Sequence, residues 1–205
     1  TRMEADGASF ANALNEAQEL GYAEADPSSD VDGLDALYKI AILARIAFRT
    51  EVPLSSIHCE GIRDVNAKDF RYASSLGYTI KLLAVARHYE GGLLARVHPA
   101  LLPLSVPMAT VSGVLNAVEV EGDLVGSLWF QGRGAGADPT ASAVIGDIIR
   151  IARSCRAGNV HAYDAFNDNG LPIVNMDKHV CQYYMCIEAL DQPGVLAKIA
   201  GVLGK

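Results

Sequence analysis

Cysteine is scarce in this sequence of 205 residues, and long uninterrupted apolar runs are absent from it. No stretch approaches the roughly 18 to 20 apolar residues that a membrane span needs, and no charged and then apolar leader precedes the first predicted helix. The cysteines form no CxxC pair and no Cys/His cluster, which disfavours disulfides and a metal site. We therefore expect no metal, no membrane partner, a cytoplasmic location, and reduced thiols at Cys59, Cys155, Cys181 and Cys186.

Positive charge is also in short supply, because 17 Lys and Arg face 24 Asp and Glu, for a net charge of −7. The imbalance is local: nine acidic side chains against Arg2 alone give residues 1–35 a charge of −8. Binding to nucleic acid needs a cationic stripe on the protein, so no nucleic acid partner is expected. A locally anionic region suits a cationic ligand such as an amine, although composition alone favours a solvated acidic surface.

Hydrophobic periodicity divides residues 1–156 into helices and hairpins. The order is helix, helix, strand, helix, hairpin, hairpin, helix, and antiparallel pairs with helices clustered around them are typical of the α+β class. We predict one mixed β-sheet covered on one face by helices, with the other face hidden in a symmetric homodimer. The second helix is predicted to begin after Asp30 or Asp32, to have its apolar side between Leu34 and Phe48, and to end before Pro53. The other predicted elements are residues 9–20, 56–59, 67–76, 79–89 with 93–98, 114–121 with 124–131, and 140–156.

Three units are predicted along the chain. Residues 1–156 form the α+β unit, and residues 157–182, which are mostly polar and turn-rich, form a connection. Residues 183–205 begin a new unit, with a strand over Tyr183 to Ala189 and then a helix from Val195 that the end of the sequence interrupts. Because the sequence also starts without Met, we expect it to be a piece of a longer protein.

The segment 21–39 is the densest in chemically capable side chains. Asp35 and Lys39 are four residues apart, so both project from one face of the predicted second helix. Lys39 is flanked by Tyr38 and Ile40 in an apolar helix, where an ammonium group would be partly desolvated and its pKa easily moved. Such a lysine can give or take a proton during reduction of a carbonyl. The alternative is an exposed ion pair that stabilises the helix by about 0.3 to 0.5 kcal/mol.

The carboxylates ahead of this helix have two interpretations. Glu24, Asp26 and Asp30 are placed to receive a substrate ammonium, and they are equally suited to capping and turn formation. Asp30 and Asp32 are both candidate N-caps of the second helix, because aspartate side chains accept hydrogen bonds from the first free N–H groups of a helix.

A glycine-rich loop over residues 132–136 precedes the last helix of the first unit. Glycine allows a ligand to approach the backbone closely, and the amides at the start of a helix favour anions. The loop is therefore a candidate place for a ligand to approach the backbone. The alternative is a turn that only connects a strand to a helix. No strand followed by GxGxxG occurs near the start of the sequence, so a dinucleotide-binding fold is not expected within it.

Two blocks of the sequence resemble the homoserine dehydrogenase family. The first is Gly-Tyr-Ala-Glu-x-Asp-Pro-x-x-Asp-Val-x-Gly-x-Asp-x-x-x-Lys over residues 21–39, and the second runs from Ser112 to Val144 around the glycine-rich loop. Both occur in the family's order, and together they cover most of residues 1–153. The resemblance implies an oxidoreductase that interconverts L-homoserine and L-aspartate 4-semialdehyde in the biosynthesis of threonine, methionine and isoleucine.

The resemblance also assigns roles to residues. Lys39 matches the family's lysine that handles the hydroxyl proton, and Asp35 matches the acidic residue that orients this lysine and hydrogen-bonds the substrate. Glu24 matches the carboxylate that binds the substrate amino group, and Asp30 is a weaker match of the same kind. The family binds its cofactor, NADP or NAD, mainly through a domain that we expect to precede Thr1. The resemblance places the glycine-rich loop near the nicotinamide, which makes Gly134, Ala135, Gly136 and Pro139 the candidate cofactor contacts.

Residues 184–200 resemble the opening strand and helix of an ACT domain, with the turn Asp-x-Pro-Gly-Val-Leu between them. Such domains bind small amino acids, so the resemblance implies threonine as an effector of the complete domain. Two other functions are compatible with the residues. One is a non-catalytic oligomerisation and amino-acid-sensing module of a biosynthetic enzyme, and the other is a different amino-acid oxidoreductase that shares this catalytic unit.

We predict that the purified 205-residue chain alone neither binds NAD(P) tightly nor turns over homoserine, because the dinucleotide-binding motif is not in its sequence. The measurement is homoserine-dependent formation of NADPH or NADH, followed by absorbance. Measurable turnover by the purified chain would contradict this expectation.

Overall fold

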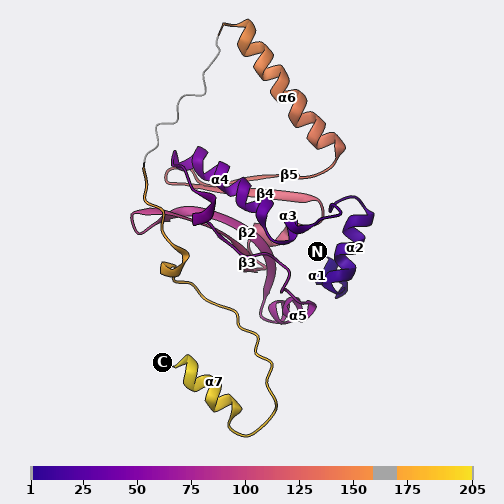
Figure 1. The fold of residues 1–205 in the computed structure, drawn as a ribbon, viewed down its shortest axis with the longest axis vertical. Helices are drawn as coiled ribbons and strands as arrows, with labels where there is room; N and C mark the ends of the chain where they lie inside the picture. Colours follow the sequence, from indigo (N-terminus) through magenta and orange to yellow (C-terminus); the bar gives the residue numbers. More distant parts are fainter. Residues whose placement is uncertain (1, 159–169, 205) are drawn as a thin grey trace.

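A mixed three-stranded sheet lies at the centre of the structure, a computed structural model that describes residues 2–158 and 170–204 (Figure 1). Its first strand runs parallel to the central strand, whereas the other two form a long antiparallel hairpin whose residues pair along the full length of both strands. The predicted mixed sheet is therefore confirmed. Across the sheet, the strands are β1 (His58–Cys59), β3 (Gly92–Pro103) and β2 (Tyr78–Tyr89).

Helix α4 (Leu34–Phe48) packs on this sheet. Its buried side chains recur three and four residues apart and share one face of the helix, while the residues of β3 that join the same core, Leu93, Ala95 and Val97, alternate along the strand. Burial of apolar side chains is the main favourable term in folding, so this contact decides where α4 lies. The core that the two elements share consists of Leu37, Ile40, Ala44, Leu93, Ala95 and Val97.

Shorter helices complete the first part of the chain. The hydroxyl of Ser9 accepts a hydrogen bond from the Asn12 N–H at 3.3 Å and begins α2, and Asp69 Oδ2 accepts from the Asn66 N–H at 2.8 Å at the start of α5. Helices α2 and α5 agree with the predicted ones, whereas α1 and α3 were not predicted. These elements are α1 (Arg2–Asp6), α2 (Phe10–Glu19), α3 (Ser28–Val31) and α5 (Ala67–Ser75), with 3-10 turns η1 (Leu54–Ser56), η2 (Pro107–Thr110) and η3 (Met176–Lys178).

The second predicted hairpin stands apart from the central sheet. Among the described residues, β4 (Leu115–Gly122) and β5 (Gly126–Arg133) pair only with each other. The alternation of apolar residues therefore predicts the hairpin itself, but it does not tell which sheet the hairpin enters. One face of the hairpin exposes the apolar side chains Val118, Val120, Leu128 and Phe130.

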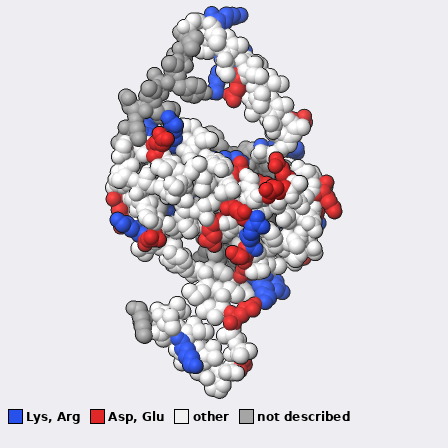
Figure 2. Space-filling model, in the orientation of Figure 1, with Lys and Arg blue, Asp and Glu red and all other residues white. Residues whose placement is uncertain are grey.

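Helix α6 (Ala137–Arg156) extends away from the body of the molecule, and none of its residues is buried (Figure 1). It is largely uncharged along the face that Figure 2 shows. Neither α6 nor any other helix in the described part of the chain is long and apolar enough to cross a membrane. Its exposed apolar side chains include Val144, Ile145, Ile148 and Ile149.

The chain from residue 170 onward returns to the sheet. Leu93 donates its N–H to the Pro172 carbonyl and accepts a hydrogen bond from the Val174 N–H, both at 2.9 Å, so this segment lies beside β3. Part of the predicted connection 157–182 is thus attached to the sheet, and residues 159–169 of it lie outside the described residues.

The strand predicted over Tyr183 to Ala189 is not formed, although the helix after it is, as α7 (Val195–Leu203). A strand needs a neighbouring strand for its N–H and C=O groups, and no described strand pairs with this segment. The segment docks on α5 instead. The Tyr184 hydroxyl donates to Asp69 Oδ1 at 3.0 Å, and a 2.7 Å ion pair joins Lys68 to Glu188.

We predict that Leu93→Ala lowers the free energy of unfolding by about 2 to 5 kcal/mol, because the truncation leaves a cavity beneath α4. Leu93 is 0% exposed. Urea unfolding measures the change, and Leu124→Ala is the matched control: Leu124 is 98% exposed, and its loss should cost less than about 0.5 kcal/mol. Equal losses in the two variants would contradict this packing.

Candidate functional site

The start of α4 is a tight turn that contacts the sheet. Gly33 lies at the N-cap position with φ of 79°, where a side chain would be strained, and a Cβ there would lie 3.2 Å from the Val97 side chain. The prediction that Asp30 or Asp32 caps this helix is wrong, because Asp30 lies within α3 and Asp32 follows it. Close packing on the sheet, rather than a capping side chain, determines where the helix begins.

The structure brings Asp35 and Lys39 together on α4. Lys39 Nζ lies 2.5 Å from Asp35 Oδ2, as the spacing of four residues predicts. The Lys39 side chain is 57% exposed and that of Asp35 is 45% exposed, so the expected partial burial of Lys39 is wrong for the described chain. Ile40, the next residue, turns into the core instead. The ammonium and its carboxylate are therefore accessible to a ligand from solvent.

Glu24 lies in the exposed loop between α2 and α3. The Gln18 side chain holds this loop by donating to the backbone carbonyls of Glu24 and Ala25 at 2.9 and 3.3 Å. No hydrogen bond or ion pair among the described residues joins the Glu24 carboxylate to Asp35 or Lys39. The described structure therefore does not bring the three predicted residues into one contact network.

Asp30 lines a groove of about 460 Å³ between α2 and β2. The groove is mostly apolar, and Lys81 is another charged residue in its wall. It does not contain Glu24, Asp35 or Lys39. Asp30 therefore does not share this groove with Asp35 and Lys39. It lies in α3, before the short turn, whereas the pair lies in α4, after it.

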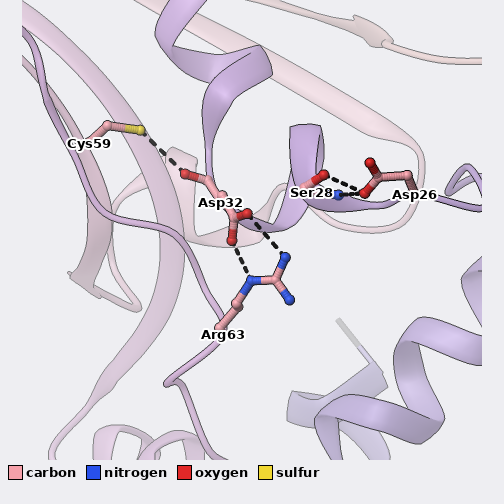
Figure 3. A network of polar contacts seen from close by, with 5 residues as sticks. All are labelled: Asp26, Ser28, Asp32, Cys59 and Arg63. Atoms are coloured by element: carbon pink, nitrogen blue, oxygen red, sulfur yellow. Dashed lines mark hydrogen bonds and ion pairs between the residues drawn. The ribbon is translucent and has the colours of Figure 1, made fainter. Parts of the chain in front are cut away.

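Asp26 has the turn-forming role that the sequence left open, while Pro27 is the N-cap residue of α3. Its Oδ1 accepts hydrogen bonds from both the hydroxyl and the N–H of Ser28, the latter at 3.1 Å, at the start of α3 (Figure 3). These bonds, first of all the one from the hydroxyl, lower the pKa of Asp26 below its ordinary value. Asp26 is therefore engaged within the chain.

A contact that the sequence did not reveal joins Asp32 to Arg63 (Figure 3). Arg63 Nε and Nη2 donate to the two carboxylate oxygens of Asp32, the second at 3.0 Å, which makes the pair bidentate. The hydrogen bond from Arg63 lowers the pKa of Asp32 below its ordinary value. The two residues are 31 positions apart and no local pattern relates them, so only the folded chain identifies the pair.

Cys59, at the end of β1, packs behind the same turn. Its thiol donates to the backbone carbonyl of Asp32 at 3.3 Å, and burial raises the pKa of Cys59 above its ordinary value. This cysteine is a partly buried thiol, whereas Cys155, Cys181 and Cys186 are exposed. In the described part of the chain, no group of three His, Cys, Asp or Glu side chains could hold a metal ion.

The glycine-rich loop is exposed and leads directly into α6. The Gly134 N–H donates to the Val114 carbonyl at 3.1 Å, and a Cβ at Gly134 would collide with the Asn116 side chain, so part of the loop's glycine content is structural. Gly136 is the N-cap residue of α6, with φ of 123°.

The start of α6 is exposed and carries an acidic residue. Ala135 is exposed, and Pro139 packs 3.5 Å from the position of a Cβ on Gly136. Asp138 lies in the first turn of α6 and weakens the attraction of that helix end for phosphate.

The homoserine dehydrogenase family model matches residues 1–149 of this chain. A homoserine dehydrogenase of Neisseria gonorrhoeae is 45% identical over 210 residues, covering 100% of this chain and 48% of that relative. The crystal structure of a homoserine dehydrogenase from Thiobacillus denitrificans has a TM-score of 0.85 at 40% identity, covering 99% of this chain and 48% of its own. A hyperthermophilic archaeal homoserine dehydrogenase in complex with NADPH has a TM-score of 0.56 at 32% identity. The match covers 71% of this chain and 41% of the archaeal chain. The chain spans about half the length of the relatives it matches.

We predict that Arg63→Gln raises the pKa of the Asp32 carboxyl toward its ordinary value of 3.8. A carboxyl whose pKa is lowered in the folded state stabilises that state above its ordinary pKa, and this contribution is lost as the pH falls through the lowered pKa. NMR titration of the aspartate carboxyl carbons measures the shift. Arg71→Gln removes another exposed arginine, on α5, and is the control; an unchanged Asp32 titration in Arg63→Gln would rule out the bidentate pair.

Proposed function

Because this chain belongs to the homoserine dehydrogenase family, we propose that it forms the substrate-binding and proton-transferring part of an enzyme that interconverts L-homoserine and L-aspartate 4-semialdehyde. One observation carries the proposal: Lys39 Nζ lies 2.5 Å from Asp35 Oδ2 on an accessible surface of α4, next to the anionic segment. An ammonium group that is both charged and oriented by a carboxylate is suited to exchange a proton with a substrate oxygen.

The pattern of engaged carboxylates supports an ammonium-bearing substrate. Among the five acidic residues from 24 to 35, the side chains of Glu24 and Asp30 have no hydrogen-bond or ion-pair partner within the described residues, so both are available to a cationic ligand. We assign these two to the substrate amino group. The engaged pairs are Asp26 with Ser28, Asp32 with Arg63, and Asp35 with Lys39.

Lys39 moves the proton in both directions of the proposed reaction. During oxidation the substrate hydroxyl proton passes to the Lys39 amine, and during reduction the Lys39 ammonium returns it to the carbonyl oxygen. NADP or NAD, when bound, accepts or supplies the hydride. Asp35 stabilises the ammonium form of Lys39, holds its Nζ at one position, and offers a carboxylate oxygen to the substrate hydroxyl.

The glycine-rich loop supplies an edge contact with the cofactor in this proposal. The residues that would hold the nicotinamide end are Gly134, Ala135, Gly136 and Pro139, which lie at the exposed start of α6. The main part of the cofactor site belongs to a dinucleotide-binding domain that this chain does not supply, which agrees with a match to about half the length of the relatives.

The exposed apolar face of the β4–β5 hairpin supports a homodimer. An exposed apolar face of this kind is typical of a protein interface, and a symmetric dimer places two copies of the same face against each other. For residues 183–205, the start of an ACT-like unit with threonine as its effector stays a prediction. The helix α7, begun by Gly194 with φ of 88°, supports that assignment, but the missing strand does not.

We predict that Lys39→Ala in the full-length protein lowers kcat for homoserine by about 100- to 10,000-fold, because positioned proton transfer contributes a factor of about that size. Lys39→Arg should stay low as well, since a guanidinium keeps its proton, and Asp35→Ala should lower kcat less. Steady-state kinetics with homoserine and either cofactor measure these changes.

The matched control for these variants is Arg150→Ala, which removes the ion pair with Asp147 on α6, another exposed helical pair at 3.0 Å. It should leave kcat unchanged. Normal turnover in both Lys39→Ala and Asp35→Ala would reject the catalytic assignment and favour the non-catalytic oligomerisation and sensing module.

A further inference from the structure

The segment 59–63 clamps the turn that joins α3 to α4 (Figure 3). The Cys59 thiol donates to the Asp32 carbonyl at 3.3 Å, and the Ile62 N–H donates to the Val31 carbonyl at 2.8 Å. The Arg63 guanidinium also binds the Asp32 carboxylate. Three contacts thus hold Val31 and Asp32. Two of them bind the backbone carbonyls of these residues, and the third binds the Asp32 side chain.

The clamp leaves little room for the turn to move. A Cβ at Gly61 would overlap the Val31 carbonyl and lie 2.6 Å from Asp32 Cα, so the two backbones touch directly. On the other side, a Cβ at Gly33 would lie 3.3 Å from Cys59 Sγ. Backbone contacts of this kind limit where the turn can lie, but they do not restrain rotation of the Asp32 side chain.

Arg63 supplies the restraint that the backbone contacts lack. Its two hydrogen bonds with Asp32 fix both the distance and the plane of the carboxylate, as a bidentate arginine pair does. Both side chains are exposed, so the pair contributes little to overall stability. Because this exposed pair lies directly before the proposed catalytic helix and has a well-defined geometry, it is better suited to orient the turn than to stabilise the fold.

We propose that Arg63 is a positioning residue, which through its bidentate pair with Asp32 fixes the α3–α4 turn and thereby orients Asp35 and Lys39 on one side and Asp30 on the other. This inference rests on the proposed function of the α4 site. Asp32 lies two residues after Asp30 and three before Asp35, so a displacement of the turn changes the separation between the amine-binding and proton-transferring groups.

A competing role for Arg63 makes different predictions. If Arg63 only neutralised a carboxylate in the anionic segment, its removal would leave Asp32 as an additional ligand for a cationic substrate, and KM for homoserine would fall at constant kcat. If Arg63 positions the turn, its removal lowers kcat, because a misplacement of about 1 Å can cost a factor of about 100 in rate.

The experiment measures kcat, KM and thermal midpoint in the full-length protein for Arg63→Ala, Asp32→Ala and the double variant. We expect each single variant to lower kcat on the order of tenfold, with KM little changed. The double variant should be no worse than either single one, since both remove the same contact. Arg63→Lys, which keeps the charge but loses the bidentate geometry, should fall between Arg63→Ala and the parent.

The exchanged variant, Asp32→Arg with Arg63→Asp, gives the sharpest result. A positioning role predicts that it recovers most of the kcat lost in the single variants, while a role of Asp32 in substrate binding predicts no recovery. Arg71→Ala is the matched control on α5 and should match the parent. Thermal midpoints close to that of the parent show that a loss of kcat is not a loss of folding.

The inference is overturned if Arg63→Ala lowers KM at constant kcat, if the two single losses add in the double variant, or if the exchanged variant recovers nothing. Lys39→Ala in the same assay separates this failure from a failure of the proposed function. Where Lys39→Ala is inactive and Arg63→Ala is normal, only the positioning role fails; where Lys39→Ala is also normal, the proposed function fails.

Discussion

Burial of one face of α4 against β3 is the contact on which the arrangement of the site depends. Leu37, Ile40 and Ala44 turn toward the sheet, so the helical period sends Asp35 and Lys39 toward solvent at the surface. The ion pair is a consequence of that packing rather than its cause. An exposed pair of this kind contributes only about 0.3 to 0.5 kcal/mol, far less than the burial of the apolar face.

The polar partners of the acidic segment before α4 explain how the chain accommodates its negative charge. Its negative charge is concentrated in a short stretch, where like charges repel. The chain offsets three of the carboxylates with a hydroxyl, a guanidinium and an ammonium group, at Asp26, Asp32 and Asp35. The charge of Glu24 and Asp30 is left for the surroundings. Most acids of this segment are thus engaged within the chain, and the remaining two are the ones that we propose for a cationic ligand.

The peripheral elements have a different character from the centre. The β4–β5 hairpin and α6 are amphipathic, yet their apolar sides are exposed in the described chain. Tyr184 and Glu188, in the segment before α7, also contact α5 through polar groups. Elements of this kind are stabilised by neighbours of their own chain or of another, and the chain matches only about half the length of its relatives.

The sequence by itself determined the class of the fold, the α2, α4 and α5 helices, both hairpins, and the Asp35–Lys39 pair. Each of these follows from a local period or spacing, which the chain keeps whatever surrounds it. Tertiary structure alone decided four other features: the separate two-stranded sheet, the start of α4 directly after Gly33, the unformed strand at Tyr183 to Ala189, and the contact of Arg63 with Asp32. These depend on which segments distant in sequence become neighbours, because strand pairing, close packing and ion pairs all require a partner that no local pattern specifies.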